Sequence, residues 1–190
     1  MITTKKELKI YLEKDLARYS FVNRKSHAFA KDNDFLIKKF IILLRKCEYF
    51  YNSKKFFAYL LCKRRKNKLA HLLCLEIPIN VFGPGLLIYH GTIVVNSSCC
   101  IGENCSLHGM NCIGNKGTSD TSCPVIGDNC EFGVGVNIIG GVKIGNNVIV
   151  SANSLVNKDI PSNTIAGGVP ASVLKNKMED QNERHYFSRR

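Results

Sequence analysis

The chain has 190 residues and a formal net charge of +12, which is long enough for one sizeable hydrophobic core or two small ones. It contains no apolar run long enough to span a bilayer, which excludes a transmembrane helix. Residues 1–7 lack the apolar core of a secretory signal. We therefore expect a cytoplasmic protein.

The positive charge is confined to the first part of the chain. Residues 1–76 contain 19 Lys and Arg against 7 Asp and Glu, whereas residues 77–190 contain eight of each kind. This asymmetry indicates either a solvated helical surface or an anionic partner, such as an acidic glycan, a membrane surface or nucleic acid. We expect no nucleic acid, because no nucleic-acid-binding module is recognisable.

Residues 1–76 are predicted to be helical, because apolar residues recur at spacings of three and four. The amphipathic stretches run through Leu8–Leu16, Phe35–Cys47 and Phe56–Leu73. Asp32 or Asn33 is a suitable N-cap for the second stretch. The basic run 63–68 interrupts the third and suits a membrane surface or a polyanion, although such a run is commonly just an exposed face.

A hexapeptide repeat begins near residue 77. Its apolar anchors are Val95, Ile101, Leu107 and Ile113, and then Ile126, Phe132, Ile138, Ile144, Val150 and Val156. The residue two positions before an anchor is mostly small. Each hexapeptide supplies one short strand and one corner, and three of them complete a triangular coil. The repeat therefore predicts a parallel β-helix over residues 77–175, followed by a polar tail over 176–190.

The repeat is interrupted once, between Ile113 and Ile126, which lie one position further apart than two hexapeptides would place them. The intervening segment 115–123 is polar, so we expect a loop that leaves the prism. Loops on rigid scaffolds often carry functional residues.

The nine cysteines follow no zinc-binding spacing. Cys99, Cys105 and Cys130 fall at the small position of the repeat, so reduced and buried thiols are expected. Cys99, Cys100 and Cys105 could hold a soft metal, but further ligands are not apparent. We expect no metal.

Two segments resemble a known family. Residues 85–96 (GLLIYHGTIVVN) resemble the active-site strand, and residues 160–171 (IPSNTIAGGVPA) the closing segment, of serine O-acetyltransferases and of the related enzymes of bacterial capsule clusters. The resemblance covers about half of the chain. It implies left-handed coiling, a homotrimer or a dimer of trimers, and acetyl-CoA bound between neighbouring coils of two subunits.

His90 and His108 are the two histidines inside the repeat, and they are separated by three hexapeptides, which make one full coil. We therefore expect them to stack one rung apart, where two close imidazoles would keep one neutral as a base near pH 7. The resemblance implies that His90 is the catalytic histidine. It also matches His108 to a histidine of capsule-type relatives, and Glu76 to an aspartate that orients the base. Structural histidines and a solvent-facing glutamate are the alternatives.

The resemblance also places the coenzyme. Contacts to acetyl-CoA are expected near Gly114, Val134 and Ala152, largely through the backbone. Lys158 and Lys175 are expected to meet the coenzyme phosphates, or else to lie on the solvated surface.

The sequence departs from the serine enzymes at positions that would bind the acceptor. They carry an Arg-His pair at the end of the loop, where this chain has Ser122-Cys123, and an acidic residue before the catalytic histidine, where it has Tyr89. An Arg would grip an amino acid's carboxylate, whereas Tyr89 suits stacking on a sugar ring.

We therefore predict that acetyl is transferred to a sugar hydroxyl of a capsular or surface polysaccharide, with Tyr89 and Asn111 contacting the acceptor. The basic N-terminal helices could also hold the enzyme at a membrane. The alternative acceptor is L-serine, which would give O-acetyl-L-serine for cysteine synthesis. A non-catalytic β-helix scaffold is a third possibility, whereas a carbonic-anhydrase-like zinc site would need a third histidine.

Overall fold

The computed structural model describes residues 1–20, 29–118 and 120–177. Three helices come first, namely α1 (Lys5–Ala17), α3 (Asn33–Asn52) and α4 (Phe56–Leu73). Thr4 caps α1 in a reciprocal capping box with Glu7, and Asp32 caps α3 by accepting a hydrogen bond from the Phe35 N–H. The predicted helical region is confirmed, and Asp32 is the N-cap of the second predicted helix.

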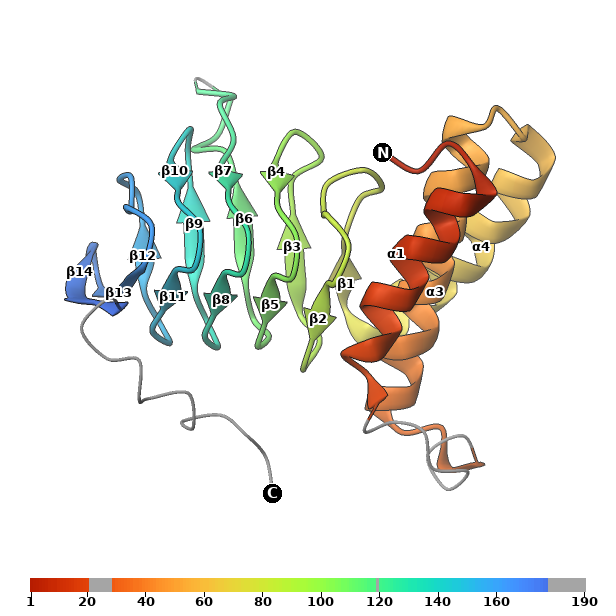
Figure 1. The fold of residues 1–190 in the computed structure, drawn as a ribbon, viewed down its shortest axis with the longest axis horizontal. Helices are drawn as coiled ribbons and strands as arrows, with labels where there is room; N and C mark the ends of the chain where they lie inside the picture. The colour runs from red at the N-terminus through yellow and green to blue at the C-terminus, as the bar shows by residue number, and fades with distance from the viewer. Residues whose placement is uncertain (21–28, 119, 178–190) are drawn as a thin grey trace.

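Short strands follow the helices and stack along one axis (Figure 1). They are β1 (Leu75–Glu76), β2 (Leu87–Ile88), β3 (Ile93–Val95), β4 (Cys100–Ile101), β5 (Ser106–Leu107), β6 (Cys112–Gly114), β7 (Val125–Ile126), β8 (Glu131–Phe132), β9 (Asn137–Ile139), β10 (Lys143–Ile144), β11 (Ile149–Val150), β12 (Leu155–Val156), β13 (Thr164–Gly168) and β14 (Ala171–Asn176). Most of the predicted tail, residues 178–190, lies outside the described residues.

The strands form three sheets with the orders β1-β3-β6-β9-β12, β10-β7-β4 and β14-β13-β11-β8-β5-β2. Paired strands are parallel, except that β13 and β14 are antiparallel. Consecutive strands from β2 to β12 fall in different sheets, so the chain winds around a three-sided prism. This is the predicted left-handed parallel β-helix.

The anchors of the repeat fill the interior of the prism. Every anchor is at most 4% exposed: Val95, Ile101, Leu107, Ile113, Ile126, Phe132, Ile138, Ile144, Val150 and Val156. Cys99, Cys105 and Cys130 are also buried, at the small position of the repeat. Burial of this apolar surface is the main stabilising contribution to the fold.

Asparagines form the corner between the three-stranded and six-stranded sheets. Asn104, Asn129, Asn147 and Asn163 all adopt φ between 56° and 60°, a left-handed conformation that asparagine tolerates better than most residues. Their side chains bond in pairs along the axis, Asn104 to Asn129 at 3.2 Å and Asn147 to Asn163 at 2.9 Å. Asparagine recurs at this corner because the backbone there is left-handed.

The coils differ in length at two places that matter for function. Cys112 is in register with Asn137, so the loop between β6 and β7 lengthens a single coil by more than one hexapeptide. The predicted loop is confirmed. The sequence suggested two hexapeptides with one additional residue between Ile113 and Ile126, but the structure shows that this whole segment lies within a single coil. A second, smaller difference places Ile88 in register with Leu107, which makes that coil one residue longer than three hexapeptides.

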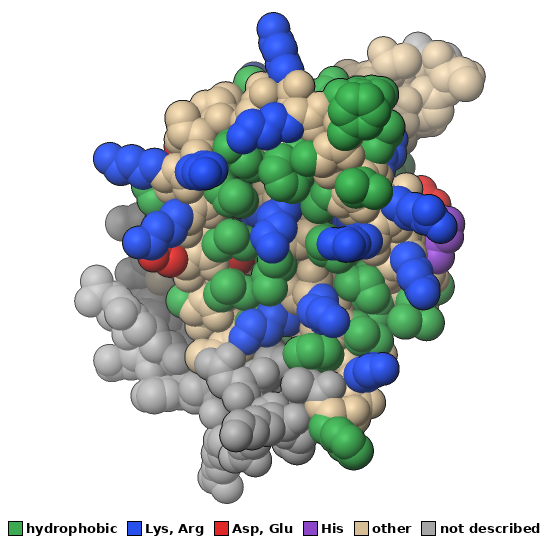
Figure 2. Space-filling view, turned by 90° about the vertical axis from the view of Figure 1, so that its right-hand side faces the viewer, with side chains coloured by type: hydrophobic (Ala, Val, Ile, Leu, Met, Phe, Trp, Pro, Cys, Tyr) green, Lys and Arg blue, Asp and Glu red, His purple; other side chains and the backbone are tan. Residues whose placement is uncertain are grey.

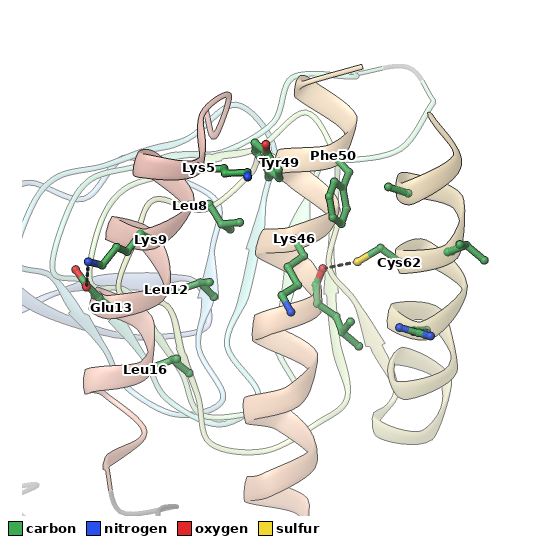
Figure 3. A pocket seen from close by; sticks show the side chains of 14 residues that line it. Lys5, Leu8, Lys9, Leu12, Glu13, Leu16, Lys46, Tyr49, Phe50 and Cys62 are labelled. Atoms are coloured by element: carbon green, nitrogen blue, oxygen red, sulfur yellow. Dashed lines mark hydrogen bonds and ion pairs between the residues drawn. The ribbon is translucent and has the colours of Figure 1, made fainter. Parts of the chain in front are cut away.

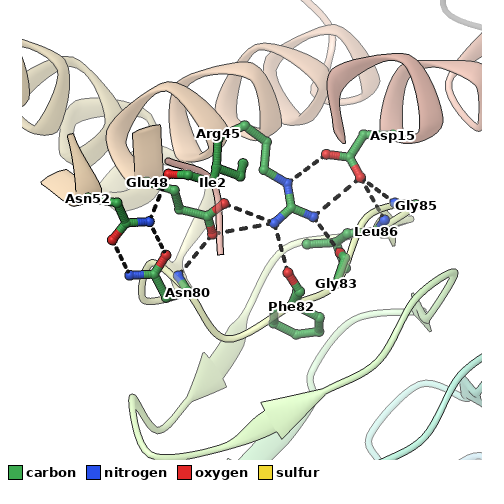
Figure 4. Close-up of polar contacts among 10 residues, drawn as sticks. All are labelled: Ile2, Asp15, Arg45, Glu48, Asn52, Asn80, Phe82, Gly83, Gly85 and Leu86. Carbon is green, nitrogen blue, oxygen red and sulfur yellow. Dashed lines mark hydrogen bonds and ion pairs between the residues drawn. The ribbon is translucent and has the colours of Figure 1, made fainter. Parts of the chain in front are cut away.

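A buried ionic network fastens the helices to the first coil (Figure 4). Arg45 and Asp15 are both 0% exposed, and the Arg45 Nε–H donates to Asp15 Oδ2 at 2.7 Å. Arg45 also pairs with Glu48 at 3.1 Å and donates to the Phe82 carbonyl at 2.9 Å. Asp15 Oδ1 accepts the Gly85 N–H at 2.6 Å. All three buried charges, Arg45, Asp15 and Glu48, therefore have charged or hydrogen-bonding partners, which is the condition for tolerating them.

Candidate active site

His90 is exposed on the corner that joins β2 to β3. Strand β2 is fixed from the helical side, because the Ile88 N–H donates to the buried Tyr19 hydroxyl at 2.7 Å. After the corner, Thr92 adopts φ +62° and its N–H donates to the Leu73 carbonyl at 3.2 Å. The backbone that carries His90 is therefore held on both sides by the helical region.

His90 lies over Gly109 of the next coil. A Cβ on Gly109 would lie 2.8 Å from the His90 Cβ, and Gly109 has φ +113°. Both the space and the backbone conformation therefore require glycine at this position. Gly109 was not predicted as a site residue, although its place one full coil after His90 is a signal that the register provides.

The structure corrects the predicted stacking of His90 on His108. The coil is longer than three hexapeptides here, because the corner between β2 and β3 holds one residue more than the corner between β5 and β6. Tyr89 consequently lies over His108, with ring centroids 4.4 Å apart and an interplanar angle of 30°. His90 is displaced by one position along the corner.

His108 contacts a carboxylate that the sequence did not indicate. His108 Nε2 lies 2.8 Å from Glu131 Oε1, and the two side chains are 20% and 27% exposed. Glu131 is the first residue of β8 and is in register with Ser106. The contact favours the tautomer in which Nε2 carries the proton and donates a hydrogen bond to Glu131. In that tautomer Nδ1 keeps its lone pair.

Glu76 lies in a different place. It ends β1, is exposed, and is in register with Val94 on the outer face of the five-stranded sheet. The carboxylate that contacts a predicted site histidine in the described residues is Glu131. An orienting role for Glu76 therefore stays a prediction.

Asn111, predicted to contact the acceptor, braces the backbone of its corner. Its side chain is buried, its Oδ1 accepts the Gly109 N–H at 2.9 Å, and its Nδ2 donates to the Gly133 carbonyl at 2.8 Å. The amide thus satisfies backbone groups of two neighbouring coils. It supports the corner beneath His90 and faces the protein interior.

Two of the predicted coenzyme positions share the corner of His90. Val134 and Ala152 are exposed, and each follows its strand anchor by two residues, as Gly109 does. The Asn153 N–H donates to the Val134 carbonyl at 2.8 Å, which stacks these turns along the axis. His90, Gly109, Val134 and Ala152 therefore form one column.

The other coenzyme positions lie elsewhere. Gly114 is buried at the end of β6, and Lys158 is exposed just after β12, so both lie at the corner that follows the five-stranded sheet. Lys175 lies on β14, in register with Ile165 at the edge of the six-stranded sheet. One chain does not bring these residues to the column of His90.

The extruded loop folds back onto that second corner. The Ser122 N–H donates to Asp120 Oδ1 at 3.1 Å, and hydrogen bonds from Ser122 lower the pKa of Asp120. A Cβ on Gly141 would lie 2.9 Å from the Ser122 Cβ, so the loop packs closely against the next coil. Ser122 and Cys123 therefore lie on a different corner of the prism from His90.

The cysteines are all free thiols. Burial, and then the nearby Cys123, raise the pKa of Cys99 to about 12, which keeps its thiol protonated near neutral pH. Within the described ranges, no group of three or more His, Cys, Asp and Glu is placed to hold a metal ion. None of the helices in those ranges is long and apolar enough to cross a membrane.

The chain is similar in sequence to a family of transferases and to individual acetyltransferases. The model of the bacterial transferase hexapeptide, six repeats, matches residues 123–158. Serine acetyltransferase 4 of Arabidopsis thaliana is 38% identical over 99 residues, which are 51% of this chain and 28% of that protein. The serine acetyltransferase of Staphylococcus aureus strain Mu50 is 32% identical over 129 residues, or 66% of this chain and 59% of that protein. The chain thus spans less than two thirds of these curated relatives.

Among solved structures, the serine acetyltransferase of Brucella abortus strain S19 in complex with coenzyme A has a TM-score of 0.69. It is 20% identical, and the match covers 90% of this chain and 69% of that one. At this identity the likeness establishes the fold, including the helical region in front of the β-helix.

Proposed function

We propose that this chain is an acetyl-CoA-dependent O-acetyltransferase whose reaction takes place at the corner that carries His90. The observation that carries the proposal is the exposed His90 above Gly109, beside the Tyr89–His108–Glu131 cluster. The similarity to serine acetyltransferases supports the same activity, because a relative with this fold binds coenzyme A.

In the proposed reaction, neutral His90 accepts the proton of the acceptor hydroxyl while the hydroxyl oxygen attacks the thioester carbonyl. The tetrahedral intermediate collapses with cleavage of the carbon–sulfur bond, and the thiolate of coenzyme A takes the proton back from the imidazolium. No acyl-enzyme is formed. His108, held by Glu131, is a second imidazole that can bond the acceptor.

We propose that the complete site forms between two subunits of a homotrimer. In one chain, the column of His90, Val134 and Ala152 lies on one corner, whereas Gly114, Lys158 and the extruded loop lie on another. A second subunit that presents its loop corner to the first subunit's His90 corner would bring both groups onto one acetyl-CoA. The mass of the particle in solution, from light scattering, tests this arrangement.

For the acceptor, we propose the hydroxyl of L-serine, because the curated relatives are serine acetyltransferases. This reverses the order that the sequence suggested. A sugar hydroxyl is the second candidate, favoured by two observations: the Tyr89 ring packed on His108 and Ser122-Cys123 at the end of the loop. A scaffold without activity is the remaining alternative.

The experiment is an acetyl-CoA assay that measures thiol release with the purified chain. L-Serine, L-serine amide and a deacetylated acidic glycan are compared as acceptors. Release that depends on L-serine and falls when its carboxylate is blocked supports the serine proposal, whereas release with the glycan alone favours the sugar. No acceptor-dependent release with any of them contradicts the enzymatic proposal.

A further inference from the structure

The helical end of the molecule has an unusual distribution of charge. Between Glu48 and Glu76 the chain contains no acidic residue but seven Lys and Arg. Figure 2, which views the molecule from that end, shows Lys and Arg side chains scattered among hydrophobic ones, with few acidic side chains between them. This face therefore carries a strong positive potential that its own residues do not neutralise.

The same face exposes large apolar side chains. On α4, Phe56 is 62% exposed, Phe57 82%, Leu61 65% and Leu72 66%. Leu60 is exposed as well. Single exposed apolar residues are ordinary, but five on one helix beside a basic run indicate a surface that binds a partner or a membrane.

A groove of about 870 Å³ lies between α1, α3 and α4 (Figure 3). Its walls are largely apolar and include Leu8, Leu12, Leu16, Leu43, Phe50 and Leu61. Basic residues, namely Lys5, Lys9, Lys46 and Arg65, line it as well. The one acidic lining residue, Glu13, lies 3.7 Å from Lys9 in an exposed ion pair.

We propose that this face docks on a lipid bilayer that contains anionic phospholipids. Phe56, Phe57 and Leu61 enter the headgroup region, and the surrounding Lys and Arg side chains bind lipid phosphates. A basic helix with aromatic and aliphatic side chains is the composition that binds such interfaces.

The charge argues against other occupants. A second copy placed face to face would bring two sets of Lys and Arg together, with Glu13 as the one acidic side chain that each groove contributes. A nucleic acid or an acidic glycan would satisfy the charge, but it would leave the exposed Phe and Leu side chains in water. An anionic bilayer satisfies both the charge and the apolar surface.

The location of the face fits this role. It lies at the end of the molecule opposite β14, with the β-helix extending away from it (Figure 1). The side chains proposed to meet the bilayer are all different from those of the His90 corner, so the proposal is independent of the acceptor and of the reaction.

The test is flotation of the full chain with vesicles. One set contains phosphatidylcholine alone, and the other contains phosphatidylcholine mixed with phosphatidylglycerol. We expect binding to the anionic vesicles only, weakened by added salt. Phe57→Ser and Arg64→Glu should each reduce binding about tenfold. Val125→Ser and Lys143→Glu, exposed positions on the three-stranded sheet, are the matched controls and should bind as the parent does.

Two results would overturn the proposal. One is the absence of binding to anionic vesicles, and a change of particle mass in Phe57→Ser would then assign the face to a contact between copies of the chain. The other is binding to anionic vesicles that Phe57→Ser leaves unchanged, since that behaviour indicates a simple polyanion site.

Discussion

Glu131 Oε1 lies 2.8 Å from His108 Nε2, although 23 residues separate the two in the chain. Together with Tyr89, whose ring packs on that of His108, the pair draws on three successive coils. Because the coils are joined by parallel ladders, the positions of these side chains are set by backbone register. This cluster adjoins the corner of His90.

The pair predicts a positioning role for Glu131. Glu131→Gln should lower kcat by roughly 10-fold to 100-fold, because His108 loses the partner that fixes its tautomer and orientation. KM for acetyl-CoA should stay within about twofold, since the coenzyme positions are untouched. Steady-state kinetics measure both constants, and nitrogen NMR of the His108 ring reports the tautomer directly.

Glu103→Gln is the matched control, because Glu103 also carries one side-chain ion pair, to Lys14 at 2.6 Å, on the surface near α1. Its kinetics should equal those of the parent. If Glu131→Gln changed neither kcat nor the His108 ring signals, the pair would have no part in positioning.

Gly109 predicts a steric requirement beneath His90. In Gly109→Ala the new methyl group would lie 2.8 Å from the His90 Cβ, so we expect His90 to be displaced and kcat to fall by about 100-fold. Gly127→Ala is the control, because its added Cβ would also meet the next coil, 2.9 Å from the Gly145 carbonyl carbon, but at a different corner from His90. Full activity in Gly109→Ala would show that the position of His90 is not critical.

Much of the β-helix follows from the sequence for a simple physical reason. A side chain that points into a narrow prism must be apolar, so anchors such as Ile101, Phe132 and Val150 repeat wherever the coil repeats. Each anchor was assigned from this pattern and is buried. The extruded loop was found in the same way, because a break in the pattern marks chain that leaves the prism.

The site was harder to predict, because its contacts depend on exact coil lengths. One additional residue between Ile88 and Val95 moves Tyr89, and not His90, over His108. The insertion between β6 and β7 has a similar effect on Glu131. The contact with His108 can be predicted only if the whole loop is assigned to one coil, which places Glu131 in register with Ser106. Apolar periodicity fixes what is inside the prism, but it leaves the register of corner residues open by one position.

The network between the helices and the first coil predicts a large loss of stability when one charge is removed. Asp15→Ala leaves the fully buried Arg45 without its nearest carboxylate, which should lower the free energy of unfolding by about 3–5 kcal/mol. Glu13→Ala on the same helix removes only an exposed pair, at a loss below about 0.5 kcal/mol. Denaturant unfolding compares the two variants, and equal losses would contradict a structural role for the network.

The capping box of α1 predicts a pH dependence. Hydrogen bonds from Thr3, and from Thr4, lower the pKa of Glu7 from 4.5 to about 2. Because the folded pKa is below the unfolded one, the contribution of Glu7 is present above pH 4.5 and is lost as the pH falls towards 2. The stability difference between the parent and Glu7→Gln should therefore shrink over that window. Thermal unfolding measures this stability difference. If the difference between the parent and Glu7→Gln stayed constant down to pH 2, the capping role would be contradicted.

The central claim is that His90 is the base of an acetyl transfer, and a single comparison tests it most directly. Thiol release from acetyl-CoA is measured with the preferred acceptor for the parent, His90→Ala and His71→Ala, the last of which replaces an exposed histidine on α4. We expect His90→Ala to lose roughly 10²-fold to 10⁴-fold in kcat and His71→Ala to match the parent. A folded His90→Ala variant that retained the parent's rate would contradict the claim.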